Sequence, residues 1–128
     1  MRSGTNRYVA VVDDDESVCR SFGRLLRVAR YQSITYPSAE EFLADKNQPH
    51  FDCLVLDIQL GGISGLELRK RLAAVGDTTP VVFITAHDDA AVRAEAEASG
   101  CAGYFSKTDP GDGILEAIRN AVSLRADS

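Results

Sequence analysis

The sequence lacks the features that would assign it to the membrane, the secretory pathway or a disulfide-stabilised fold. No apolar run approaches the length that crosses a bilayer, and the first residues, MRSGTNR, contain no apolar core for a signal peptide. The three cysteines, Cys19, Cys53 and Cys101, are odd in number and widely spaced, which indicates neither a disulfide framework nor a CxxC metal site. We therefore expect a cytoplasmic chain without membrane contact, whose cysteines are small core side chains.

An excess of basic residues is also absent. The chain carries 14 Lys and Arg against 19 Asp and Glu, a formal net charge of -5 at pH 7. Proteins that recognise phosphate backbones usually present a basic face, so we expect no direct nucleic-acid binding by this chain. The acidic balance instead favours protein partners, cations or both.

Internal repeats, low-complexity segments and linkers are absent as well. The 128 residues match the usual size of one domain. We predict a single domain over residues 1–128, with its core at about 8–124 and frayed ends at Met1–Asn6 and Ala126–Ser128. No segment beyond the last predicted helix could form a second domain, so either the protein acts by docking or the chain is part of a longer one.

What the sequence does contain is a regular alternation of short apolar runs with stretches of helical period. The runs at 8–12, 33–36, 53–57, 81–84 and 103–106 are predicted to be strands, and this alternation is typical of an α/β fold with a parallel sheet. Five such units joined by right-handed crossovers can form a doubly wound, flavodoxin-like five-stranded sheet of order 2-1-3-4-5.

The first two predicted helices have recognisable starts. Asp15 precedes a stretch of helical period and is the expected N-cap residue. Ser38-Ala-Glu-Glu41 is a capping box, and the helix that it opens should turn Phe42 and Leu43 inward.

The third and fourth predicted helices differ in how much apolar surface they offer. Residues 65–75 supply Leu66, Leu72 and Val75 as expected core contacts. Residues 88–99 are rich in Ala, so this helix should be held weakly to the sheet and is the element we expect to move. Gly100 should end it in a left-handed conformation.

Four predicted strands end on a chemically reactive side chain. Asp13 and Asp14 follow the first strand, Asp57 closes the third, Thr85 follows the fourth and Lys107 follows the fifth. Ligands of open parallel sheets bind beyond the carboxyl ends of the strands, at the point where the strand order reverses. These side chains should therefore form one site.

The chemistry of that site follows from its groups. Three clustered carboxylates repel one another unless a cation joins them, and a hard ion with oxygen ligands, Mg2+ or alternatively Mn2+, fits. The Thr85 hydroxyl and the Lys107 ammonium would stabilise a phosphoryl group arriving on Asp57. Asp57 is then the nucleophile, and an aspartyl phosphate is the product.

At these residues the chain resembles the receiver domain of two-component response regulators. The resemblance covers residues 8–124, and it rests on four motifs in family order and spacing: Val11-Val-Asp-Asp14, Asp57 with Gly65, Phe83-Ile-Thr-Ala86 and Gly103-Tyr-Phe-Ser-Lys107. Each motif alone has little specificity, whereas the four together are highly specific.

The resemblance implies a role for each matching residue. It makes Asp57 the phosphoacceptor, Lys107 the phosphate-binding lysine, and Thr85 and Tyr104 a coupled pair that reports phosphorylation. The metal ligands that it implies are Asp13, Asp14, Asp57 and the backbone carbonyl of Gln59.

The resemblance also implies partners. The phosphoryl group would come from a sensor histidine kinase or a histidine phosphotransfer protein. A downstream effector or a second copy of the chain would bind the surface made by residues 88–99, the strand 103–106 and the last helix. Such a domain is a signalling switch rather than a dedicated enzyme, although it can phosphorylate and dephosphorylate itself. Residues 103–108 are similar to receivers that precede helix-turn-helix domains.

Two departures from the family pattern keep alternatives open. Gly61 and Thr108 stand where the family usually has proline, so we expect a flexible loop after Asp57 and a trans Lys107–Thr108 peptide. The losses count in favour of a receiver fold used only for docking, without phosphate chemistry, whereas the intact acidic pair, Thr85 and Lys107 count against it. A phosphohydrolase of the haloacid dehalogenase type also uses an aspartate nucleophile, but it needs a second Asp where this chain has Gln59.

Overall fold

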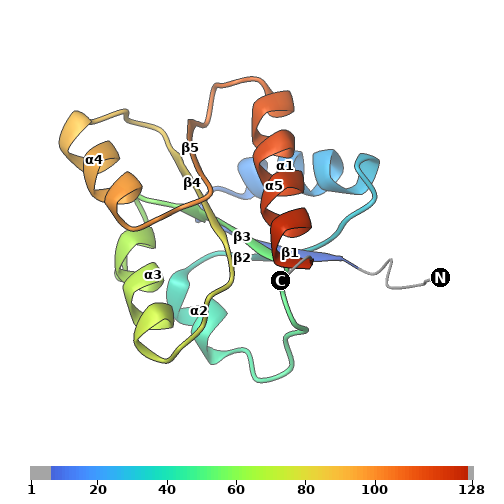
Figure 1. Ribbon diagram of the computed structural model, residues 1–128, viewed down its shortest axis with the longest axis horizontal. Helices are drawn as coiled ribbons and strands as arrows, with labels where there is room; N and C mark the ends of the chain where they lie inside the picture. Colours follow the sequence, from blue (N-terminus) through green and yellow to red (C-terminus); the bar gives the residue numbers. More distant parts are fainter. Residues whose placement is uncertain (1–6, 127–128) are drawn as a thin grey trace.

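Five strands alternate with five helices in the computed structural model, which describes residues 7–126 (Figure 1). The strands are β1 (Tyr8–Val12), β2 (Gln32–Tyr36), β3 (Cys53–Asp57), β4 (Val81–Thr85) and β5 (Gly103–Ser106). The helices are α1 (Glu16–Val28), α2 (Ala39–Ala44), α3 (Gly65–Ala74), α4 (Ala90–Ala98) and α5 (Gly111–Ala126). The expected fraying of residues 1–6, 127 and 128 lies outside the described residues, whereas Ala126 is the last residue of α5.

The strands form one parallel sheet in the order β2-β1-β3-β4-β5, which confirms the predicted doubly wound topology. Alternate strand residues point to opposite faces, so the two faces have separate cores. Val9 and Val11 pack with Phe22 of α1 and Ile118 of α5. On the other face α2, α3 and α4 cover the sheet, and Figure 1 shows these two groups of helices on opposite sides.

The predicted capping interactions are confirmed. The Asp15 side chain accepts the Ser17 N–H, and the Ser38 hydroxyl accepts the Glu41 N–H at 3.0 Å. Gly100 ends α4 with φ of 78°, the left-handed conformation that glycine adopts without strain. The sequence predicts these helix ends correctly because each one depends on residues a few positions apart.

Two predicted core contacts were wrong. Val75 is 79% exposed, because α3 ends at Ala74 and the apolar stripe that faces the sheet runs instead through Leu68 and Leu72. Leu43 is 37% exposed, because α2 is one short helix on which the neighbouring Phe42 takes the inward position.

The cysteines and the remaining boundaries differ only slightly from expectation. Cys53 is fully buried in the sheet, whereas Cys19 and Cys101 are half-buried at the edges of the two cores. The fourth strand begins at Val81 as expected, and α4 begins at Ala90, after its N-cap Asp89, rather than at residue 88. No helix within residues 7–126 combines the length and the apolar character that a bilayer crossing requires.

Substitutions of Leu68 and Val75 test which side chains hold α3 to the sheet. Leu68→Ala should lower the free energy of unfolding by about 2 to 5 kcal/mol, because it opens a cavity at a fully buried position. Val75→Ala should change it by less than about 0.5 kcal/mol, since that side chain is in solvent. Urea unfolding of both variants measures the difference. Equal losses would mean that the helix is packed in another register.

Candidate functional site

The ends of β1, β3 and β5 bring together two buried carboxylates and one ammonium. Asp13 and Asp57 are each 1% exposed. The Lys107 Nζ lies 2.9 Å from Oδ2 of Asp13 and 2.9 Å from Oδ2 of Asp57, and it donates a hydrogen bond to the latter. Lys107 therefore spans the sheet from β5, across β4, to the two acidic strand ends.

Burial and charge oppose each other within this group. Burial raises the pKa of the Asp57 carboxyl, the Lys107 ammonium lowers it, the nearby Asp13 carboxylate raises it, and the net direction is upward. Burial also lowers the pKa of the Lys107 ammonium, but the Asp13 and Asp57 carboxylates outweigh it, so this pKa is raised. Lys107 consequently stays charged at neutral pH.

A hard cation fits beside these groups. Carboxylate oxygens of Asp13, Asp14 and Asp57 lie within 4.8 Å of one another, with Asp14 on the solvent side. The buried Oδ2 of Asp13 forms its ion pair with Lys107 and lies beside two further carboxylates. A cluster of three carboxylates is a donor set that Mg2+ or Mn2+ takes.

The fourth strand contributes the Thr85 hydroxyl, which is completely buried. Its oxygen lies 2.8 Å from the side-chain Oε1 of Gln59 and 2.8 Å from the carbonyl oxygen of His87, and one hydroxyl proton serves both acceptors in turn. The His87 N–H donates back to the hydroxyl at 3.1 Å. The sequence assigned only a backbone role to Gln59, so this side-chain contact is a finding of the structure.

The loop between Asp57 and α3 is held by a residue that sequence reasoning missed. The Glu40 carboxylate on α2 accepts the N–H of Ile63 at 3.0 Å, a hydrogen bond that lowers the pKa of Glu40. Gly62 has φ of 78°, and a Cβ there would collide with the same carboxylate. At Gly65 a Cβ would strike the carbonyl oxygen of Asp57, which explains the glycine eight residues after Asp57.

Tyr104 sits on β5 with its ring against the start of α4. Its side chain is 9% exposed, and its hydroxyl donates to Oδ1 of Asp88 at 3.4 Å. The Arg93 guanidinium forms an ion pair with Asp88 at 3.0 Å and lies over the tyrosine ring, 4.5 Å from its centroid. Asp88 and Arg93 thus join Tyr104 to the loop that follows Thr85, a contact that no local motif signals.

The loop around Lys107, which has no proline after the lysine, is held by hydrogen bonds of its backbone. The Lys107–Thr108 peptide is trans as predicted, since residues 7–126 contain no cis bond. The Lys107 N–H donates to the Thr85 carbonyl at 2.8 Å, and the Ser106 N–H donates to Oδ2 of Asp109 at 2.8 Å. These bonds fix the backbone that presents the ammonium.

The raised pKa of Asp57 predicts a pH-dependent gain in stability for Asp57→Asn without divalent ions. A carboxyl whose folded pKa lies above its unfolded pKa contributes most when protonated, and this contribution is lost as pH rises through the folded pKa. At pH 7 the variant should be more stable than wild type by on the order of 1 kcal/mol. Near pH 4 the gain should shrink. Urea unfolding in chelator at both pH values measures it, and a less stable variant at pH 7 would contradict the pKa direction.

Comparison with known proteins places this arrangement in one family. The profile of the response regulator receiver domain matches residues 9–119. The response regulator protein TmoT of Ectopseudomonas mendocina is 33% identical over 116 residues, which are 91% of this chain and 53% of that protein. The transcriptional regulatory protein FixJ of Azorhizobium caulinodans is 34% identical over 119 residues, 93% of this chain and 56% of that protein.

Solved structures agree with the sequence matches. A response regulator receiver protein from Burkholderia phymatum has a TM-score of 0.79 at 40% identity, covering 92% of this chain and 96% of that one. The response regulator StyR has a TM-score of 0.85 at 37% identity, covering 95% of this chain and 62% of that one. The chain spans about half the length of the curated relatives described above. With its sheet order, its strand-end site and these matches, the chain belongs to the receiver domain family of two-component response regulators.

Proposed function

We propose that this receiver accepts a phosphoryl group on Asp57 from a histidine of a sensor kinase or of a histidine phosphotransfer protein. The observation that carries the proposal is the Lys107 ammonium, 2.9 Å from each of two buried carboxylates at the ends of β1 and β3. Burying this cluster of charges costs free energy. The position of the ammonium suits the oxygens of a phosphoryl group on Asp57.

The transfer is a displacement at phosphorus. An oxygen of the Asp57 carboxylate forms a bond to phosphorus while the bond from phosphorus to the histidine nitrogen breaks, and the electron pair of that bond stays on the imidazole. Loss of phosphate is the reverse kind of step, in which water attacks phosphorus and the Asp57 oxygen leaves as carboxylate. Self-phosphorylation and autodephosphorylation thus use the same groups.

Three groups of the chain prepare Asp57. The Gln59 N–H donates to Oδ1 of Asp57 at 3.0 Å, which leaves Oδ2 on the side of Lys107. The Lys107 ammonium then passes from the carboxylate to the arriving phosphoryl oxygens. Thr85 must give up its bond to the Gln59 side chain or to the His87 carbonyl before its hydroxyl can donate to phosphate.

A divalent ion would be held by Asp13, Asp14, Asp57 and the backbone carbonyl of Gln59. Bound there, Mg2+ or Mn2+ supplies positive charge against the phosphoryl oxygens and relieves the repulsion among the carboxylates. The cluster of three carboxylates, whose oxygens lie within 4.8 Å of one another, supports this assignment.

The output surface that we propose is made by α4, β5 and α5. The α4 helix buries only Ala96 fully, so its attachment to the sheet is weak. Movement of the Thr85 hydroxyl changes the bonds of the loop through His87 and Asp88, and Asp88 holds the Tyr104 hydroxyl. A downstream effector or a second copy of the chain would read the resulting shift.

Phosphorylation itself is tested with acetyl phosphate and Mg2+. Wild type should acquire one base-labile phosphate, and the beryllium fluoride complex should bind with Mg2+, because it mimics a phosphoryl group on a carboxylate. Asp57→Asn should lose both, whereas Glu16→Gln, which changes an exposed acid beside the site, should retain both. Mass spectrometry measures the phosphate, and fluorine NMR detects the bound beryllium fluoride. A wild-type protein without label would favour the docking-only alternative, and equal labelling of Asp57→Asn would contradict the assignment of Asp57 as phosphoacceptor.

The switch is tested by Thr85→Ala, with Thr85→Ser as the matched control that keeps the hydroxyl. The alanine variant should still be phosphorylated on Asp57 but should show no change in amide exchange over residues 86–107. Wild type and Thr85→Ser should show the change. Coupling of about 1 to 3 kcal/mol corresponds to a roughly 5- to 150-fold change in partner affinity. Unchanged exchange in phosphorylated wild type would contradict this route.

A further inference from the structure

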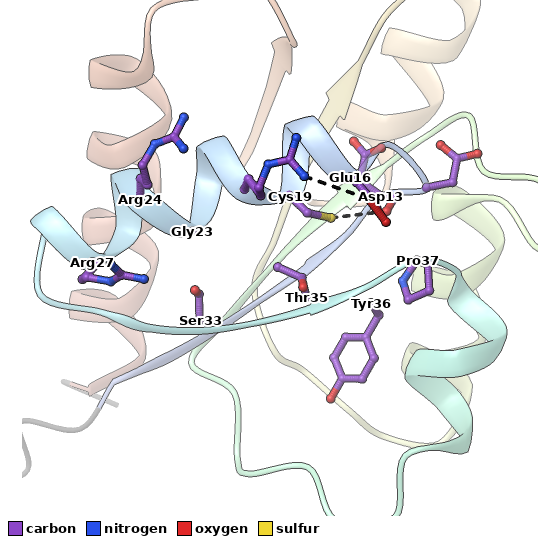
Figure 2. A pocket seen from close by; sticks show the side chains of 12 residues that line it. Asp13, Glu16, Cys19, Gly23, Arg24, Arg27, Ser33, Thr35, Tyr36 and Pro37 are labelled. Atoms are coloured by element: carbon purple, nitrogen blue, oxygen red, sulfur yellow. Dashed lines mark hydrogen bonds and ion pairs between the residues drawn. The ribbon is translucent and has the colours of Figure 1, made fainter.

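A groove of about 620 Å3 runs between α1 and the edge strand β2, away from the α4, β5 and α5 surface. In Figure 2 the helix lies along the strand, and Ser33 and Thr35 rise from β2 beneath it. The charge of the residues that line the groove changes along its length. Asp13, Asp14 and Glu16 line one end, and the rest is lined by Arg20, Gly23, Arg24, Arg27, Ser33 and Thr35.

The basic part of the groove contains two arginines that form no ion pair within the described residues. Arg20 lies 3.9 Å from the Glu16 carboxylate, but Arg24 and Arg27 have no acidic group within 4.0 Å among residues 7–126. A hollow that adjoins it is lined by Arg27, Arg30 and Ser33. Four arginines therefore follow one another along this rim.

Gly23 and Arg30, which both lie along the groove or its rim, are residue types that their backbone positions do not favour. Gly23 lies inside α1, where glycine is less favourable than alanine, yet a Cβ there would meet only the Ser33 hydroxyl at an ordinary 3.7 Å. Arg30 has φ of 72° at the end of α1, where glycine is usual. The fold requires neither residue, but glycine at 23 keeps the floor of the groove open and arginine at 30 extends its charge.

The strand beneath the groove has an open hydrogen-bonding edge. β2 pairs only with β1 in the described sheet. The Gln32 N–H and the Tyr36 carbonyl bond toward β1, so by alternation the backbone groups of Ser33 and Thr35 point away from it. An extended peptide can add to such an edge.

We propose that this groove binds an extended acidic segment of a partner protein, added to β2 with its carboxylates on alternate residues. Alternate side chains of a strand are about 6.6 Å apart. Arg20 and Arg24 are separated by about 6 Å along the helix, and Arg24 and Arg27 by about 4.5 Å. A nucleic acid matches less well, because it has no peptide backbone that could pair with the open edge of β2. This site does not depend on phosphate chemistry at Asp57.

The probe is an eight-residue peptide with Glu at alternate positions, titrated against the whole chain in chelator. Wild type should bind it, and its affinity should fall at least 10-fold when the glutamates are replaced by glutamines or when salt is raised from 50 to 500 mM. Arg24→Gln with Arg27→Gln should lower affinity at least 10-fold. Arg119→Gln, an exposed arginine of α5 outside the groove, should leave it unchanged.

Two further readouts separate this geometry from general charge attraction. The backbone amides of Ser33 and Thr35 should become protected from exchange when the peptide binds, because they would donate to it. Gly23→Gln should fill the groove and lower affinity at least 10-fold, while Gly23→Ala should raise the thermal unfolding midpoint by roughly 2 to 5 °C. Binding without protection at Ser33 and Thr35, equal loss with Arg119→Gln, or tighter binding of a single-stranded oligonucleotide than of the peptide would each overturn the proposal.

Discussion

The site depends on one ion pair network, in which Lys107 pairs with two buried carboxylates at the ends of different strands. Asp13 and Asp57 are each 1% exposed, and the ammonium 2.9 Å away offsets part of the cost of burying their charge. Removal of Lys107 would leave both carboxylates without their partner, a change that typically costs about 3 to 5 kcal/mol. The strand order β1-β3-β4-β5 lets Lys107 meet both acids, with Thr85 on the strand it crosses.

The loop between Asp57 and α3 is positioned by glycines and by one contact from another helix. Gly65 allows α3 to start directly against the Asp57 carbonyl, and the Glu40 carboxylate fixes the loop before it through the Ile63 N–H. Gly61, which replaces the usual proline, lies in open space, since a Cβ added there would meet no atom within 4 Å. Glu40 on another helix is therefore one anchor of this loop.

The sequence predicted features that depend on neighbours in the chain or on the regular alternation of strands. The sheet order, the caps at Asp15 and Ser38, and the meeting of Asp13, Asp14 and Asp57 belong to this class. Contacts such as Glu40 with Ile63, 23 residues apart, and Thr85 with Gln59, 26 apart, depend on where side chains end after packing. No period or motif marks them. Val75 and Leu43 failed for a related reason, since apolar character alone does not fix which way a residue at a helix end points.

The acidic cluster at the strand ends adjoins the groove between α1 and β2. Asp13 and Asp14 belong to the acidic cluster and also line the acidic end of the groove. A cation or phosphoryl group bound at the cluster would change the charge that a ligand in the groove meets, and this effect would fall off over roughly 8 to 10 Å in physiological salt. Because such coupling is reciprocal, an acidic segment bound near this end would change cation affinity by the same factor. Asp13 and Asp14, which belong to both the cluster and the groove, would therefore couple the two proposed sites through charge alone.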